Sequence, residues 1–192
     1  MRRQSGLKQV ASLGGDQAAD AGILTGLQTG PQTGLKTGRD VAVMGRGYVL
    51  MAVRNGEAHL AEQMQSFAEQ SHTGWDLIAS DDGSTDRSLA ILAEFAARWS
   101  KVPEPHAVTV LNGPCRGFVR NFFHLLRAVP GDAAFAALSD QDDVWFPDKL
   151  QRALTALAEL PEGQPGLYCA RSLVCDADLR PFSDPGSCRL RL

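Results

Sequence analysis

Three carboxylates stand within four residues, in the order Asp140, Gln141, Asp142 and Asp143. An apolar run at residues 133–138 comes directly before them, and Pro147 follows a few residues later. Carboxylates this dense repel one another unless a cation lies among them, and their oxygens suit Mg²⁺ or Mn²⁺. The competing interpretation is a solvated acidic turn whose Asp residues cap a helix, which is the more common case for a lone Asp-x-Asp pair.

Apolar runs and helical periodicities predict the elements that would position this cluster. Strands are expected at residues 48–53, 75–79, 106–111, 133–138 and 167–174. Helices are expected after the first four strands. Ser84 or Thr85 is the expected N-cap of the second helix, and Pro147 fits the first turn of the fourth.

The third expected helix carries an apolar stripe that we expect to face the core. Its members are Phe118, Phe122, Leu125, Leu126 and Val129.

This alternation predicts an α/β domain with a mostly parallel sheet, flanking helices and right-handed crossovers. Ligands of such sheets bind at the carboxyl ends of the strands. Polar clusters at residues 54–57, 80–86 and 140–143 each follow a predicted strand. They can therefore converge on one edge of the sheet, which favours a ligand site over an isolated acidic turn.

Composition narrows the classes of function. The chain has 192 residues and a net charge of −3, which does not suggest a nucleic-acid partner. It contains no apolar run long enough to span a membrane and no secretory signal pattern. The four cysteines form no C-x-x-C pair, so reduced thiols in a cytoplasmic protein are expected. The four histidines lack metal-ligand spacing and are expected at the surface or in helices.

Residues 1–45 differ in composition from the rest of the chain. They are rich in Gly, Gln, Thr and Ala, and a Thr-Gly pair recurs every four residues between positions 25 and 38. We expect a disordered tail here, a segment read from an upstream start codon, or a short interaction tail. The predicted division is therefore a tail at 1–45, a folded domain at 46–180 and an irregular tail at 181–192.

Four motifs in order resemble the inverting family 2 glycosyltransferases of the GT-A fold. The first two are Ser-Asp-Asp-Gly-Ser-Thr-Asp at residues 80–86 and Leu-Ser-Asp-Gln-Asp-Asp-Val-Trp at residues 138–145. The others are residues 51–57, where the family usually has Thr/Ala-x-Tyr-Asn-Gly-Glu, and residues 117–122. The resemblance covers roughly residues 47–175. It is strongest to the rhamnosyltransferase-like branch that builds bacterial surface polysaccharides.

The resemblance implies roles for individual residues. Nucleotide-sugar contacts are expected from Ala52, Arg54, Asn55, Glu57, Asp82, Arg120 and Asp140, and metal contacts from Asp142 and Asp140. Asp82 would accept a hydrogen bond from the base, whereas Asp81 would be structural. Asp142 would contact the metal directly, with Asp140 nearer the ribose or a metal-bound water. Arg120 would add charge near the phosphates, or would be an exposed helix residue.

The implied reaction moves a sugar, with inversion, from a UDP- or dTDP-linked donor to a saccharide or a lipid-linked acceptor. A divalent metal, Mn²⁺ or Mg²⁺, would neutralise the nucleotide-diphosphate leaving group. A lipid-linked acceptor would place the protein in the cytoplasm at the inner face of the plasma membrane, as a peripheral protein.

Two departures from the family pattern qualify this reading. Arg54 stands where the family commonly has Tyr, so a guanidinium contact would replace stacking on the base. No catalytic base is assigned, because in this family it lies on the acceptor side, well beyond the Asp-x-Asp. Asp176, Asp178 and Asp184 are the carboxylates left there, and none stands in a convincing acceptor motif. We therefore expect a C-terminally truncated chain.

Two alternatives to an active transferase are open at this point. The first is a non-catalytic nucleotide-sugar-binding module, or an inactive fragment that lacks the base. The second, another metal-dependent phosphoryl-transfer enzyme, is weaker, because neither a Walker A motif nor an Asp-x-Asp-x-Thr loop occurs.

Overall fold

The computed structural model describes residues 8–11, 23–26, 45–161, 163–176 and 179–180. In chain order the elements are β1 (Lys8–Ala11), β2 (Ile23–Gly26), β3 (Gly47–Val53), α1 (Leu60–Ala68), β4 (Trp75–Asp81), α2 (Ser88–Trp99), β5 (Val108–Asn112), α3 (Phe118–Ala128), β6 (Ala136–Ser139), β7 (Asp143–Trp145), α4 (Lys149–Leu157), β8 (Gly166–Cys169) and β9 (Ser172–Cys175). Among these helices, none combines the length and the apolar character that crossing a bilayer requires.

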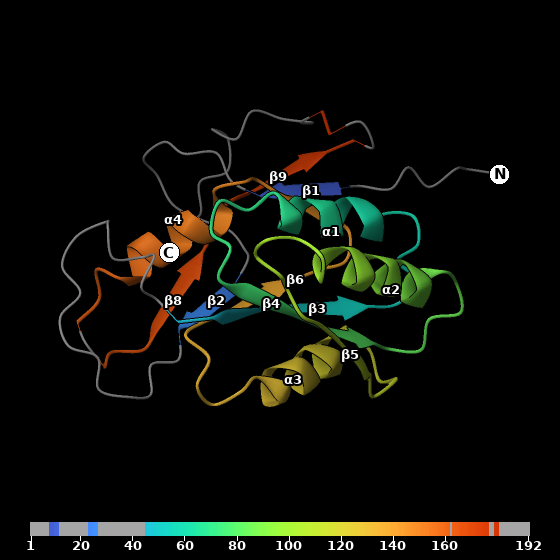
Figure 1. Cartoon of the computed structure of the whole chain (residues 1–192), viewed down its shortest axis with the longest axis horizontal. Coiled ribbons are helices and arrows are strands. Elements are labelled where there is room, and N and C mark those ends of the chain that lie inside the picture. The colour runs from blue at the N-terminus through green and yellow to red at the C-terminus, as the bar shows by residue number, and fades with distance from the viewer. Residues whose placement is uncertain (1–7, 12–22, 27–44, 162, 177–178, 181–192) are drawn as a thin grey trace.

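A six-stranded sheet in the order β5-β4-β3-β6-β2-β8 forms the centre of the fold. Strands β5, β4, β3 and β6 are parallel to one another, while β2 runs antiparallel to both β6 and β8. Helices α1 and α2 lie on one side of this sheet and α3 lies on the other (Figure 1). The expected mostly parallel α/β sheet flanked by helices is confirmed.

Strand β3 is covered on both faces, which explains its continuous apolar sequence. Val49 and Met51 point to the larger core beneath α1 and α2, whereas Leu50 points to a smaller cluster that includes Leu125 of α3. All four side chains are fully buried. A strand covered on both faces needs apolar residues at every position, which is the usual pattern of parallel sheets.

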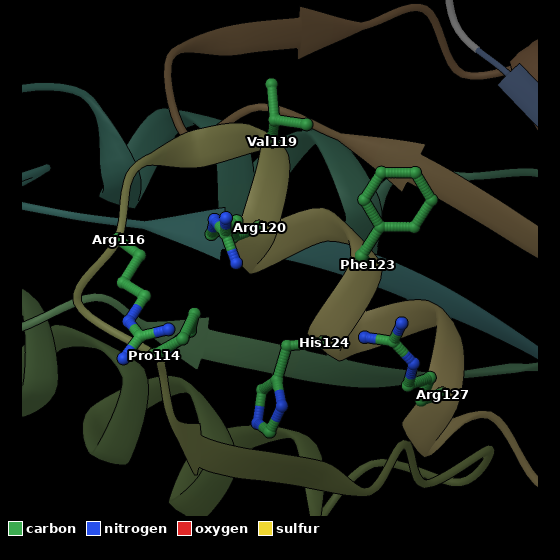
Figure 2. Close-up of a pocket in the computed structure, with 7 residues that line it drawn as sticks. All are labelled: Pro114, Arg116, Val119, Arg120, Phe123, His124 and Arg127. Atoms are coloured by element: carbon green, nitrogen blue, oxygen red, sulfur yellow. The ribbon is translucent and has the colours of Figure 1, made fainter.

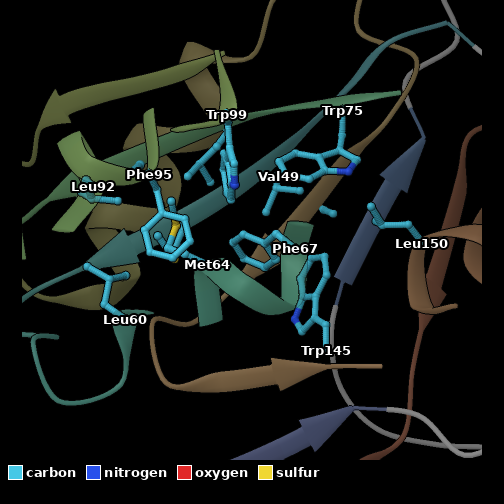
Figure 3. Close-up of a cluster of buried hydrophobic side chains, with 14 of the residues drawn as sticks. Val49, Leu60, Met64, Phe67, Trp75, Leu92, Phe95, Trp99, Trp145 and Leu150 are labelled. Atoms are coloured by element: carbon cyan, nitrogen blue, oxygen red, sulfur yellow. The ribbon is translucent and has the colours of Figure 1, made fainter. Parts of the chain in front are cut away.

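Aromatic side chains dominate the larger core (Figure 3). Trp75 packs edge-on against Trp99 and Phe67, and Phe67 in turn packs against Trp145 with ring centroids 4.7 Å apart. Such edge-to-face contacts add to the free energy of burying the rings. Trp99 and Trp145 are both buried.

Several local predictions need correction. The predicted strand at 167–174 is two strands, β8 and β9, which belong to different sheets. Helix α2 begins at Ser88, after Ser84 and Thr85, and α4 begins at Lys149, two residues beyond Pro147. Phe118, expected in the core, is 72% exposed. It lies in the first turn of α3, where the helix starts at the edge of the sheet.

Two further predictions about side chains are wrong. His72 and His106 are buried and not at the surface. Apolar contacts explain both positions, since His106 stacks on the Trp75 ring at 3.8 Å and His72 packs edge-on against Phe135.

Two stretches of the expected N-terminal tail are strands. β1 pairs with β7 and β9 in a three-stranded sheet, and β2 lies between β6 and β8 in the main sheet. Composition gave no sign of them, because strand pairing uses backbone N–H and C=O groups that nearly any sequence supplies. The rest of 1–45 and the tail at 181–192 lie outside the described residues.

Candidate functional site

The carboxyl ends of four parallel strands meet at one edge of the main sheet. In the strand register, Val53 of β3 stands beside Asp81 of β4, and Asp81 stands beside Asn112 of β5. On the other side of β3, Met51 stands beside Ser139 at the end of β6. The loops that follow these strands therefore lie next to one another, and they carry the polar clusters singled out in the sequence.

Gln141 joins the acidic cluster to the loop after β3. Its Oε1 accepts a hydrogen bond from the Arg54 N–H at 2.8 Å, and its Nε2 donates to the Arg54 carbonyl at 3.0 Å. The amide thus pairs with one backbone residue through both of its polar ends. Gly56 makes room for it, because a Cβ at that position would lie 2.6 Å from Oε1. This clamp fixes the loop that carries Asp140, Asp142 and Asp143 relative to the loop after β3, where contacts to the nucleotide are predicted.

A second set of bonds joins the loop after β3 to the loop after β4. The Asn55 N–H donates to Oγ of Ser84 at 2.9 Å, and Oδ1 of Asn55 accepts the Thr85 N–H at 2.8 Å. Asn55 adopts a left-handed conformation with φ 49°, which Asn tolerates better than most residues. Ser84 and Thr85, expected to cap α2, bind this neighbouring loop instead.

Asp86 performs the capping expected of Ser84 or Thr85. Its Oδ1 accepts the Ser88 N–H and the Ser88 hydroxyl, and its Oδ2 accepts the Glu57 N–H at 2.9 Å. The hydrogen bond from the Ser88 side chain is the main reason that the pKa of Asp86 lies below its usual range. The Glu57 carboxylate in turn accepts the Arg87 N–H at 3.2 Å. Asn55 and Glu57 therefore brace the two loops, and contacts to a nucleotide sugar remain a prediction for both.

Asp82 ties the loop after β4 to the segment that precedes α3. Its Oδ1 accepts the Cys115 N–H at 2.6 Å and its Oδ2 accepts the Gly117 N–H at 3.1 Å. The side chain is buried. Gly117 has φ +85° and Cys115 has φ 53°, so this segment turns sharply around the carboxylate.

Asp81 differs from Asp82 in its hydrogen bonds. Its Oδ2 accepts the Ser84 N–H at 3.0 Å, while its Oδ1 is buried without a hydrogen-bond partner among the described residues. The fully unused acceptor at this strand end thus belongs to Asp81, whereas both oxygens of Asp82 already bind backbone. Assignment of Asp82 to the base and of Asp81 to structure remains a prediction.

Electrostatic repulsion acts within the acidic cluster. Burial, and then the charge of Asp142, raises the pKa of Asp140. Burial, and then the charge of Asp140, raises the pKa of Asp143 to about 7, although Lys149 opposes this rise. At Asp140 and Asp143 the charges of neighbouring carboxylates thus add to the effect of burial, and a cation would stabilise this cluster.

Lys149 is a buried positive charge beside the acidic cluster, where it interacts with Asp143. Its Nζ lies 4.6 Å from the centroid of the Trp145 ring. Burial lowers the pKa of Lys149 to about 8, against the opposing charge of Asp143. Because β7 runs from Asp143 to Trp145, one end of this short strand lies in the acidic cluster and the other in the aromatic core.

Helix α1 holds the start of the acidic loop. Nε2 of Gln63 donates to Oγ of Ser139 at 2.8 Å, and that hydroxyl donates to the Asp140 carbonyl at 2.9 Å. Gln63 and Ser139 are buried.

A divalent metal fits these residues only in part. The oxygen donors and the mutual repulsion of Asp140 and Asp142 suit Mg²⁺ or Mn²⁺. Within the described ranges, however, no group of three or more His, Cys, Asp or Glu side chains could hold a metal ion. Asp140 and Asp142 could thus hold a metal together with oxygens from a phosphate and from water.

The remaining predicted residues lie on both sides of this edge. Ala52 is half-buried on the α3 side of the sheet, and the Arg54 residue is exposed. Arg120 lies on the outer face of α3, in a cavity with Arg116 and Arg127 (Figure 2). The structure therefore places Arg120 on an exposed helix face, which was the alternative to a phosphate contact.

Sequence reasoning missed Gln141, Asp86 and Asn121 as positioning residues. Asn121 is buried in α3, where its Nδ2 donates to the Ser80 carbonyl at 2.9 Å and its Oδ1 accepts the Ser80 hydroxyl. Asn121 and Gln141 stand inside the motifs singled out above. The available signal was that Asn121 is a polar residue within an apolar stripe and that Gln141 interrupts an acidic run.

Comparison with known proteins fits this geometry. Residues 48–170, more than half of the chain, match the model of glycosyl transferase family 2. The dTDP-rhamnosyl transferase RfbG of Shigella flexneri is 34% identical over 110 residues, which are 56% of this chain and 36% of that protein. The chain thus spans little more than a third of the length of this relative.

A solved structure shows the same fold. The mannosyltransferase PcManGT of Pyrobaculum calidifontis, in complex with GDP-Man and Mn²⁺, superposes with a TM-score of 0.50 at 22% identity. The match covers 59% of this chain and 32% of the mannosyltransferase. The expected GT-A type of fold is confirmed, and the extent of the family match shows that this chain belongs to glycosyl transferase family 2.

Proposed function

We propose that the chain binds a nucleotide-diphosphate sugar, UDP- or dTDP-linked, at the edge formed by the loops after β3, β4, β5 and β6. One observation carries the proposal. The side chains of Gln141, Asn55 and Asp82 accept hydrogen bonds from backbone N–H groups of neighbouring loops and so join these loops into one braced edge, and the acidic cluster lies at its β6 end. A pre-organised edge can bind a ligand without a large cost in loop ordering.

Asp140 and Asp142 are the proposed metal-binding residues, with Asp142 in direct contact. A divalent ion would neutralise charge on the diphosphate leaving group when the glycosidic bond breaks. The raised pKa values of Asp140 and Asp143 support the assignment: burial is their main cause, and the charges of neighbouring carboxylates add to it. Asp82, with both oxygens bound to backbone N–H groups, holds the segment before α3 in place and remains the proposed partner of the base.

The proposed reaction is transfer of the sugar to a saccharide or a lipid-linked acceptor with inversion. The proposed place is the cytoplasmic face of the plasma membrane. Support for both comes from family membership and from the match to a rhamnosyl transferase. The enzymatic activity of this chain is part of the proposal, since the match covers little more than a third of that relative.

Nucleotide-sugar binding without transfer is the second candidate. The observation behind it concerns Asp176, which is the described one of the acidic candidates beyond β9 and whose carboxylate is engaged in a local turn. The Asp176 Oδ1 accepts the Arg180 N–H at 2.9 Å within a tight turn. No general base is therefore assigned.

One experiment separates the two candidates. The protein is incubated with Mn²⁺ and UDP- or dTDP-sugars, and both binding and release of free nucleotide are followed, with and without a saccharide acceptor. Saturable, metal-dependent binding with release supports the transferase. Binding without release supports the module, and failure to bind any of these nucleotides contradicts both.

A further inference from the structure

The outer face of α3 combines positive charge with exposed apolar side chains. We define the α3 face by Arg120 and Arg127, by the apolar residues Val119 and Phe123, and by Arg116, which lies two residues before the helix. Positions 120, 123 and 127 recur at helical spacing, opposite the buried side of the helix that contains Asn121 and Leu125. Figure 2 shows these five residues around one cavity of about 640 Å³.

The positive charge on the α3 face is not neutralised within the described part of the chain. None of its three arginines forms an ion pair with a described residue. Residues 105–131 contain three arginines and no Asp or Glu, although the whole chain has a net charge of −3. The charge is therefore concentrated on one surface, and an anionic partner would complement it.

The apolar side chains on the same face are exposed to an unusual degree. Phe123 is 55% exposed and Val119 is 51% exposed. Each could bury more apolar area only against something outside the described chain. Aromatic and aliphatic groups beside arginines on one helix face are the pattern of helices that lie in a membrane interface.

We propose that the α3 face docks on an anionic phospholipid bilayer. The arginines would bind headgroup phosphates while their apolar stems lie along the interface, and Val119 and Phe123 would enter the boundary between headgroups and acyl chains. Helix α3 would then lie parallel to the membrane surface.

Charge and apolar exposure together select this partner. A free phosphate would bind the arginines but would leave Val119 and Phe123 exposed. A second copy of the chain, docked face to face, would bring the three arginines of each copy together, and like charges would repel.

This inference rests on the proposed function for the membrane location and deepens it by naming the surface that would bind the lipid. Membrane binding is measured without nucleotide, metal or acceptor. Failure of vesicle binding would therefore leave the donor-site proposal standing, and failure of nucleotide binding would leave this one standing.

Co-sedimentation with lipid vesicles tests the proposal. The whole chain is mixed with phosphatidylcholine vesicles that contain either no phosphatidylglycerol or a high fraction of it, at low and at high salt. We expect binding only to the anionic vesicles and weaker binding at high salt. Equal binding to both kinds of vesicle, or none to either, would overturn the proposal.

Variants locate the surface. Arg116→Gln/Arg127→Gln should lower the partition coefficient roughly 25-fold, since each arginine near an anionic surface is worth about fivefold, or about 1 kcal/mol. Phe123→Ser should lower it as well. Arg87→Gln/Arg98→Gln removes the same charge from the N-cap and the last turn of α2, which covers the opposite side of the sheet, and should have little effect (Figure 1).

The remaining outcomes have definite readings. An equal loss in the α2 variant would mean non-specific attraction and contradict the proposal. Loss of binding in the presence of inorganic pyrophosphate, at constant ionic strength, would indicate a site for free anions instead. A change of sedimentation coefficient in the α3 variants without lipid would indicate self-association. Circular dichroism spectra that match the unsubstituted chain exclude unfolding as the cause.

Discussion

The loops at the acidic edge and the outer face of α3 treat polar groups in opposite ways. At the edge, the side chains of Gln141, Asn55 and Asp82 bind neighbouring backbone, and each bond joins two different loops. On the α3 face, Arg116, Arg120 and Arg127 form no ion pair with a described residue. In the first region the polar side chains hold neighbouring loops together, whereas in the second the charged side chains are available to a partner.

This difference separates two kinds of binding surface. A braced edge loses little conformational entropy when a small ligand enters, which suits selective recognition of a nucleotide. Arginines without ion-pair partners in the described chain are not held in one position, and beside exposed apolar side chains they suit the surface of a lipid bilayer. Substitutions should therefore change stability at the edge and leave it nearly unchanged on the α3 face.

Removal of the Asp82 carboxylate should give the largest change in stability. Asp82→Ala deletes two hydrogen bonds from backbone N–H groups to a buried charge, and it leaves the Cys115 and Gly117 N–H groups unsatisfied. We expect a loss of about 3 kcal/mol or more in the free energy of unfolding, measured by urea denaturation. Asp82→Asn, which keeps one acceptor, should lose about half as much.

Asp132→Asn is the matched control, because this exposed residue precedes β6 in a turn. Its effect should stay within about 0.5 kcal/mol. Equal losses in Asp82→Ala and Asp132→Asn would show that Asp82 does not brace the edge.

Breaking the Gln141 clamp should have a smaller effect on stability and a clear effect on ligand binding. Gln141→Ala removes both hydrogen bonds to Arg54, worth about 1–2 kcal/mol in total. Nucleotide affinity, measured by calorimetry, should fall roughly tenfold, because about the same free energy would then be needed to hold the acidic loop in its binding position.

Gly56→Ala tests the same clamp without changing its polar groups. The new Cβ would lie 2.6 Å from Oε1 of Gln141 and displace the amide. It should reproduce the loss of nucleotide affinity, while Gln151→Ala on the exposed side of α4 should not. Normal affinity in both clamp variants would exclude the clamp as a positioning device.

His106 lies just before β5, at the end of the sheet opposite the acidic edge, and should give a pH-dependent effect. Burial is the main reason that its pKa lies below 6.5 in the folded chain, even though its Nδ1–H donates to the Trp75 carbonyl. The unfolded chain therefore takes up the proton more readily, so stability falls as pH drops through about 6.5. His106→Gln should flatten this fall between pH 7.5 and 5.5 in thermal melts. A steeper fall in the variant would contradict the assignment.

Substitution on the α3 face should change stability least. Arg116→Gln/Arg127→Gln breaks no described hydrogen bond or ion pair, so the free energy of unfolding should change by no more than about 0.5 kcal/mol. A loss as large as that of Asp82→Ala would mean that these arginines stabilise the fold, and the comparison between the two regions would fail.

The sequence predicted the parallel core of the fold well because its signals are local. The apolar runs of β3 and β4 and the stripes of α1 and α3 need no knowledge of partners. The chain's change of sheet between Cys169 and Ser172 could not be predicted in this way, because an apolar run does not show which strand it pairs with. Phe118 failed for a related reason, since periodicity gives the direction of a side chain and not what lies beneath it.

Prediction of the site was limited in the same way. Spacing along the chain brought Asp82 and Asp140 to one edge, because both follow parallel strands. It could not show that Asn55 and Glu57 bond to the neighbouring loop, or that Gln141 reaches Arg54, which is 87 positions away. Such partners depend on the three-dimensional distance between loops.

Metal-dependent nucleotide binding tests the central claim most directly. Titration of the unsubstituted chain with UDP and dTDP, in Mn²⁺ and then in EDTA, should show saturable binding of at least one nucleotide only when the metal is present. Asp142→Asn should weaken that binding about 100-fold or more, because loss of a direct ligand should cost at least as much as loss of an outer-shell partner. Binding that survives both EDTA and Asp142→Asn would contradict the account, and so would failure to bind either nucleotide in Mn²⁺.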